Sequence, residues 1–194
     1  MKKVSITLLL FVFYFNSYAQ VPDVDSQIAA AIQAAPEEIR EGAMVYGYDA
    51  NGNLITLRKG SNDMICLADD PNKSGFNAAC YHKDIEAFMA RGRELRAQGK
   101  TSSEIFDTRE EDAKSGKLKM PDHPTTLHVL SGSDGTYNPE TGVVDNAFLR
   151  YVVYIPFATS ASSGLPTKPP GPGHPWIMDP GTHRAHIMIS PPRE

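Results

Sequence analysis

Residues 44–57 read MVYGYDANGNLITL, and this stretch decides the fold. Two runs rich in β-branched and aromatic residues, MVYGY and LITL, flank a polar turn. The Asn51-Gly52 pair favours the positive φ angles of a tight hairpin turn. A third apolar run follows at residues 63–67. The first half of the chain therefore predicts an antiparallel meander of three strands.

Three segments have helical patterns. Residues 24–35 have high helix propensity. Residues 83–98 are amphipathic, with apolar side chains on one face and charged side chains on the other. Thr101 begins a capping box with Glu104, which predicts a further helix that runs to about residue 114.

The second half of the chain returns to strand patterns. Runs at residues 126–130, 149–155 and 185–189 predict strands, and residues 138–142 predict a turn. The segment 158–173 is rich in Ser, Gly and Pro and predicts an extended surface loop. The whole pattern predicts an α+β domain, in which one mainly antiparallel sheet carries helices packed on one face.

The chain contains two cysteines, Cys66 and Cys80, and neither belongs to a C-x-x-C motif. In an oxidising compartment an isolated pair most simply forms one disulfide. A metal or redox pair is the rival interpretation. A cross-link across this spacing stabilises a fold by roughly 3 kcal/mol in the chain-entropy model.

The N-terminus has the pattern of an export signal. Lys2 and Lys3 precede an apolar stretch at residues 6–15, and Ser-Tyr-Ala follows at residues 17–19. Small residues at the two positions read by a signal peptidase predict cleavage that leaves Gln20 as the mature N-terminus. We therefore expect a protein that acts in the periplasm or outside the cell.

The mature chain, residues 20–194, has the length of one domain. Removing Lys2 and Lys3 from a whole-chain formal charge of −4 leaves −6. This acidity argues against nucleic acid or an anionic membrane surface as the main partner. No later apolar run approaches the length of a membrane span. We expect a monomer that does not insert into a membrane.

Histidines carry the candidate chemistry. His128 and His186 alternate with apolar residues in two predicted strands. If these strands pair, both imidazoles face one side of the sheet, and Asp179 could orient one of them. A metal site needs three or more converging ligands, so we assign no metal. The simpler interpretation is that these imidazoles bond loop backbone or lie on a polar face of the sheet.

The segment 175–182 carries the only tryptophan and a Pro-Gly turn. A tryptophan beside a proline-rich loop lines a ligand groove or covers the core. We expect a C-terminal groove that binds a small molecule or an envelope or surface partner. A hydrolase that uses a metal ion or a His/Asp pair is the alternative, with catalytic residues and cofactors unassigned. The expected binding residues are Trp176, Asp179, His183, His186 and His128.

The chain resembles a group of small exported bacterial proteins that are uncharacterised. The resemblance rests on the processed N-terminus, on Gly60-Ser61-Asn62 before Cys66, and on the ending WIMDPGT at residues 176–182 followed by Ala-His-Ile. It implies no established activity and no catalytic residue. It supports treating the two cysteines and the C-terminal segment as parts of one architecture.

Overall fold

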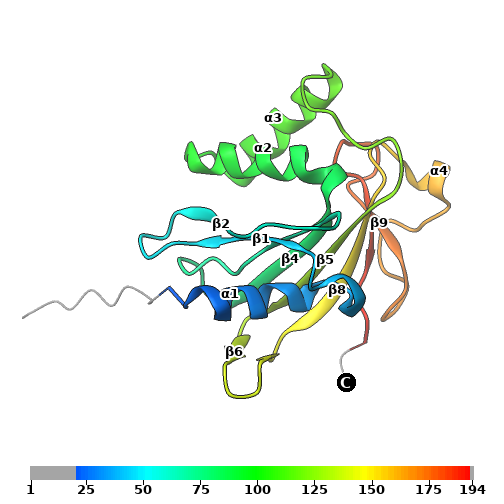
Figure 1. Ribbon diagram of the computed structural model, residues 1–194. Coiled ribbons are helices and arrows are strands. Elements are labelled where there is room, and N and C mark those ends of the chain that lie inside the picture. The colour runs from blue at the N-terminus through cyan, green and yellow to red at the C-terminus, as the bar shows by residue number, and fades with distance from the viewer. Residues whose placement is uncertain (1–20, 193–194) are drawn as a thin grey trace, which may run out of the picture.

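A computed structural model describes residues 21–192 (Figure 1). The expected signal segment at residues 1–19 and the expected mature N-terminus at Gln20 lie outside the described residues. Within the described range, no helix is both long enough and apolar enough to cross a membrane.

An eight-stranded sheet forms the centre of an α+β fold. Its strand order is β2-β1-β3-β4-β5-β8-β10-β9. Every neighbouring pair is antiparallel except β1 and β3, which are parallel, so the sheet is mixed but mainly antiparallel. The strands are β1 (Met44–Tyr48), β2 (Leu54–Arg58), β3 (Met64–Leu67), β4 (Phe76–His82), β5 (Thr125–Gly132), β8 (Phe148–Tyr154), β9 (Trp176–Met178) and β10 (His186–Ile189).

The predicted meander is only half correct. β1 and β2 form the expected antiparallel hairpin, but β3 pairs with β1 rather than with β2. Met64, Ile65 and Cys66 are all buried, whereas most of β2 is exposed. Because β3 buries both of its faces, it takes the interior position and leaves β2 at the edge.

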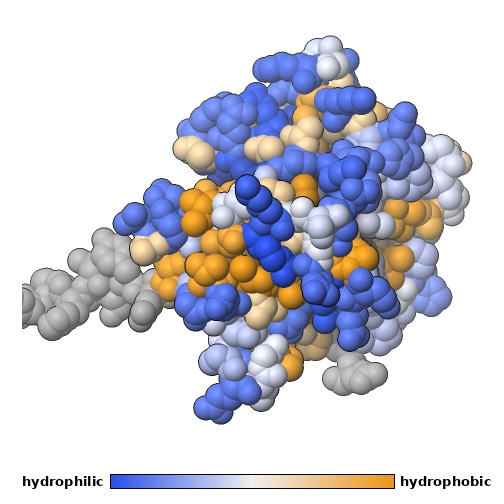
Figure 2. Space-filling model, in the orientation of Figure 1, coloured by the Kyte–Doolittle hydropathy of each residue, from blue (hydrophilic) through white to orange (hydrophobic). Residues whose placement is uncertain are grey.

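The edge strand β2 is exposed. Figure 2 shows apolar side chains gathered over β1 and β2, and Leu54 and Ile55 are 37% and 40% exposed. At the opposite edge, the backbone N–H of Ile177 in β9 donates to the carbonyl of Pro166 at 2.9 Å. The proline-rich loop therefore covers one edge of the sheet, while β2 forms the other edge.

Helices lie on both faces of the sheet, which corrects the expectation of one face (Figure 1). Helix α1 (Val24–Ala31) and the 3₁₀ turn η1 (Ile32–Ala34) cover one face, on which Cys66 and Cys80 lie. Helix α2 (Glu86–Ala97) covers the other face, and α3 (Ser102–Lys114) packs against α2. The central strands are apolar on both sides, so both faces need cover.

The remaining elements are short. They are η2 (Glu37–Ile39), η3 (Lys83–Ile85), α4 (Ser160–Ser163) and the strands β6 (Thr136–Asn138) and β7 (Val143–Asp145). β6 and β7 form a separate antiparallel hairpin around the predicted turn at 138–142. The side-chain amide of Gln33 donates to the carbonyl of Gly142, and its oxygen accepts from the N–H of Val144. These two bonds tie the hairpin to η1.

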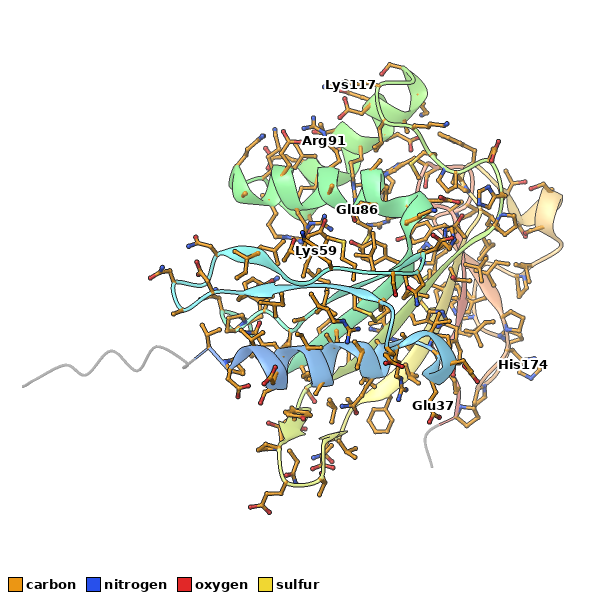
Figure 3. The ribbon with its side chains drawn as sticks, in the orientation of Figure 1. Glu37, Lys59, Glu86, Arg91, Lys117 and His174 are labelled. Atoms are coloured by element: carbon orange, nitrogen blue, oxygen red, sulfur yellow. A yellow bond between two sulfur atoms is a disulfide. The ribbon has the colours of Figure 1, made fainter. Side chains whose placement is uncertain are left out.

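A polar network fixes α2 to the sheet. The phenol of the fully buried Tyr81 donates to Glu86 at 2.6 Å. Arg93 donates to Glu86 at 2.6 Å and to the Tyr81 oxygen at 3.0 Å. Figure 3 shows Glu86 at the underside of α2, facing the sheet. Because each polar group has a partner, the network can be buried without an unsatisfied atom.

The predicted disulfide is present. Cys66 of β3 and Cys80 of β4 are bonded and lie directly opposite each other in the antiparallel register. Both residues are fully buried beneath α1 and η1. The bond therefore clamps two central strands within the core.

Candidate functional site

The predicted Pro-Gly turn shapes the C-terminal segment. The N–H of Thr182 donates to the carbonyl of Asp179, and Gly181 has a φ of 80°. Glycine at this position admits the positive φ that the turn requires. The turn directs the chain back, so that Nε of Arg184 donates to Asp179 at 2.7 Å. Asp179 thus binds an arginine rather than a histidine.

His183 is completely buried and pairs with Glu110 of α3. Its backbone N–H and its Nδ1 both contact Oε2 of Glu110, at 2.8 and 2.5 Å. Burial lowers the pKa of His183, although the bond to Glu110 acts in the opposite direction. Nδ1–H of a neutral imidazole therefore donates to an ionised carboxylate. The rings of Phe88 and Phe106 flank the imidazole.

The pKa of Glu110 fits this arrangement. Burial alone would raise the pKa of Glu110, but hydrogen bonds from Lys114 and His183 outweigh burial and lower it to about 2. The Nε2 atom of His183 has no hydrogen-bond partner within the described part of the chain. Aromatic rings flank this imidazole, and neither His183 nor Glu110 lines the grooves and the pocket described below. The pair therefore anchors the C-terminal segment onto α3.

His186 is also buried, on the face of the sheet that α2 covers. Its Nδ1 lies 2.7 Å from the carbonyl oxygen of Arg184, so Nδ1–H is the donor. Burial lowers the pKa of His186, and the bond to Arg184 acts in the opposite direction. His186 therefore bonds loop backbone, as the simpler interpretation of the sequence expected.

His128 does not meet His186. Strand β8 lies between β5 and β10, so the strands of the two histidines do not pair. His128 is opposite Cys80 and Tyr151, whereas His186 is opposite Tyr154. Cys80 belongs to the core beneath α1, while Tyr154 belongs to the core beneath α2. The two imidazoles consequently lie on opposite faces of the sheet.

The chemistry expected for the alternative function is not assembled at these residues. Over residues 21–192, no group of three or more His, Cys, Asp and Glu side chains is placed to hold a metal ion. Asp179 is engaged by Arg184, and His186 by a backbone carbonyl. The hydrolase stays a prediction without a described site.

Trp176 lines a groove, which is one of the two roles that its position beside the proline-rich loop allows. The groove has a volume of about 340 Å³. Figure 3 shows His174, one of its lining residues, at the side of the molecule away from the β1–β2 hairpin. Trp176 is half-buried, and His174 is exposed. The lining residues are Pro169, Gly171, Pro172, Gly173, His174, Trp176 and Ser190.

A second groove adjoins the first at Ser190, which lines both. It has a volume of about 470 Å³ and lies at the start of β4 and β8 and the end of β5. We call the two together the C-terminal groove; of the expected binding residues it contains Trp176, whereas Asp179, His183, His186 and His128 line neither part. The second part is lined by Ser74, Phe76, Asn77, Ser131, Gly132, Ser133, Phe148, Leu149, Arg150, Ser190 and Pro191.

Arg150 is the charged residue of this groove. Its Nη2 donates to the hydroxyl of Ser131 at 3.0 Å, which orients the half-buried guanidinium. Among the described residues, no carboxylate forms an ion pair with Arg150. A guanidinium has five N–H donors, so most of them remain for another acceptor.

Sequence reasoning did not identify Arg150 as a site residue. The only signal was an arginine within the otherwise apolar run LRYVVYI at residues 149–155. An arginine in a strand that should bury both faces calls for an explanation. The hydroxyl and amide donors near it, Ser131 and Asn77, lie on other strands and cannot be found without the strand order.

Comparison with protein-family models, with curated proteins and with solved structures gives no match to this chain. Function is therefore inferred from the residues of the grooves and pockets themselves.

Proposed function

We propose that this protein is an exported, monomeric binding protein, and that the C-terminal groove takes a small anionic molecule. The observation that carries the proposal is Arg150, a half-buried guanidinium that bonds a neutral hydroxyl in a groove of adequate size. Ligand sites usually have volumes of roughly 300–1,000 Å³. Carboxylate and phosphate groups match the donor geometry of arginine.

The surroundings of Arg150 favour an anion with an apolar or aromatic portion. Ser131, Ser133 and Asn77 line the same groove and carry hydroxyl and amide groups. On the other side of Ser190, Trp176 contributes a flat apolar wall. A ligand that spans Ser190 would place its charge near Arg150 and its apolar part against Trp176.

The proposed location is the periplasm or the cell exterior. The N-terminal pattern of residues 1–19 and the buried Cys66–Cys80 disulfide both support export. Outside the cytosol, a protein of this kind meets small molecules from the surroundings or from the cell envelope. An envelope macromolecule would be the occupant if small anions fail to bind.

Fluorescence can test the proposal, because Trp176 is the only tryptophan of the chain. We would titrate the mature protein with 3-phenylpropanoate and with the neutral 3-phenylpropanamide. We expect a saturable change in emission with the carboxylate and affinity at least about tenfold weaker for the amide. Equal affinities for the two compounds would contradict a role for charge.

Two variants locate the charge. Arg150→Gln should weaken binding of 3-phenylpropanoate by about tenfold or more, since a charge-assisted bond is lost. Arg96→Gln removes the same charge from an exposed position on α2 that lines no part of the groove, and should leave affinity unchanged. If both variants bind alike, Arg150 does not recognise the ligand.

A further inference from the structure

A separate pocket lies between α1 and the β6–β7 hairpin. Three segments line it: the start of α1, the connection from β3 to β4, and the beginning of the hairpin. Its volume is about 400 Å³, which is large enough for a small ligand. We call it the hairpin pocket. It is lined by apolar and aromatic side chains, including Pro22, Phe76 and Tyr137, and by two charged residues, Asp69 and Lys73.

The walls of the hairpin pocket are held in place. The amide of Gln27 donates to the carbonyl of Tyr48 and accepts from the N–H of Tyr48, which fixes α1 on β1. Gln33 binds the β6–β7 hairpin from the other side. Asp69 accepts a hydrogen bond from the N–H of Asn77 at 2.8 Å, which fixes the third wall. A pocket built from such contacts is pre-formed, so a ligand need not order it.

Asp69 supplies this pocket with a carboxylate, while the ammonium of Lys73, which also lines the pocket, is held by Asp70. Burial raises the pKa of Asp69 and the nearby charge of Asp70 adds to this shift, while the N–H of Asn77 and the charge of Lys73 oppose it. Among the described residues, no ion pair involves Asp69, because Lys73 is bound to Asp70 at 2.7 Å. A carboxylate partly removed from water gains from a cationic partner.

Tyr48, which accepts and donates backbone hydrogen bonds with Gln27 of the pocket wall, lies close enough to feel the charges of Asp69 and Asp70. Burial raises the pKa of Tyr48 to about 12, and the charges of Asp70 and Asp69 act in the same direction. The ring of Tyr137 adds a π face on which a cation can rest. The pocket therefore combines the carboxylate of Asp69, the rings of Phe76 and Tyr137 and apolar walls, with Lys73 held by Asp70.

We propose that the hairpin pocket binds the ammonium group of a small amine, which Asp69 contacts while the hydrocarbon body lies against Phe76 and Tyr137. The hairpin pocket shares Phe76 with the second part of the C-terminal groove, but its recognising charge has the opposite sign and lies on the connection between β3 and β4. Its ligand class is a primary amine with a compact apolar or aromatic body.

The test uses nuclear magnetic resonance of the mature chain from Gln20. ¹H–¹⁵N spectra would be recorded during titrations with 2-phenylethylammonium, with hexylammonium and with the neutral 2-phenylethanol. We expect saturable shifts of the Asp69, Thr136 and Tyr137 amides with the ammonium probes, and affinity about tenfold weaker for the alcohol. The proposal is overturned if neither ammonium probe binds, or if the shifts occur at other residues.

A matched pair of variants tests whether the charge of Asp69 binds the ammonium group. Asp69→Asn keeps an oxygen that can accept from the N–H of Asn77 but removes the negative charge, so affinity for the ammonium probes should fall about tenfold. Asp145→Asn removes the same charge from an exposed position on β7 that does not line the pocket, and should bind as the unchanged protein does. Equal binding by the Asp69→Asn variant would overturn the proposal, provided that its spectrum shows an intact fold.

Discussion

Glu110 binds His183 twice through one oxygen, at the backbone N–H and at Nδ1, although 73 residues separate them. The pair joins α3 to the C-terminal segment within a setting of aromatic rings. A carboxylate that satisfies two buried donors leaves both unpaired when it is removed. The contact between Glu110 and His183 should therefore contribute to the stability of the fold.

Glu110→Ala should lower the free energy of unfolding by about 2–4 kcal/mol, because the backbone N–H and the imidazole of His183 lose their acceptor. Urea unfolding followed by circular dichroism measures this change. Glu111→Ala is the matched control, since Glu111 is the neighbouring residue of α3 and is exposed. Similar losses in the two variants would show that the pair does not anchor the segment.

Acid should destabilise the protein in two separate ranges of pH. Burial lowers the pKa of His186 in the folded state below 6.5, so the unfolded chain binds more protons as the pH falls below that value. Glu110 has a folded pKa of about 2 against an ordinary 4.5, so its contribution is lost only as the pH falls from about 4.5 toward 2. Urea midpoints between pH 7.5 and 2.5 should therefore fall in two steps.

Variants can test which histidine causes the loss of stability in the upper of the two pH ranges. His186→Asn keeps a donor for the carbonyl of Arg184 but cannot be protonated, so stability should depend less on pH between about 6.5 and 5. Asp122 raises the pKa of His123 above 6.5, so His123 acts with the opposite sign and above about pH 6.5, and His123→Gln should leave the slope between about 6.5 and 5 nearly unchanged. An unchanged slope in His186→Asn would exclude His186 as the cause.

Reduction of the disulfide should lower the free energy of unfolding by roughly 3 kcal/mol in the chain-entropy model. Thermal unfolding with and without a reductant measures the loss, and the double variant Cys66→Ala/Cys80→Ala should show a similar or larger one. The variant also leaves space in the core beneath α1, where both residues are fully buried. An unchanged midpoint after complete reduction would mean that the bond contributes nothing.

Gln27→Leu should destabilise the protein by about 1–3 kcal/mol, since the N–H and carbonyl of Tyr48 lose their side-chain partner. Gln98→Leu is the control, because Gln98 is exposed at the end of α2. Chemical unfolding of both variants measures the difference. Comparable stability of the two would show that α1 does not depend on this contact.

Features set by neighbouring residues could be predicted from the sequence. The Asn51-Gly52 hairpin, the Thr101–Glu104 capping box and the Pro180-Gly181 turn each depend on a few adjacent residues, and all three are present. The disulfide also followed, because only two cysteines were available. In each case few other structures are compatible with the residues involved.

Features set by distant contacts could not be predicted. β4 follows the polar turn segment at residues 69–75 and has no clear alternation, so its strand character depends on pairing with β3 and β5. The separation of His128 from His186 follows from β8 lying between their strands, and the strand order is not encoded locally. Glu110 has no feature in its own segment that indicates His183 as its partner.

The division of the sheet along the chain has a consequence for how the protein reaches its folded state. β1 to β4 and both cysteines lie before residue 83, and the strands beyond β4 begin at Thr125. If the chain is exported as we propose and passes through a translocation channel from its N-terminus, this first part, with both sulfur atoms, emerges before β5. Oxidation of the two cysteines would then fix β3 against β4 before β5 pairs with the other edge of β4.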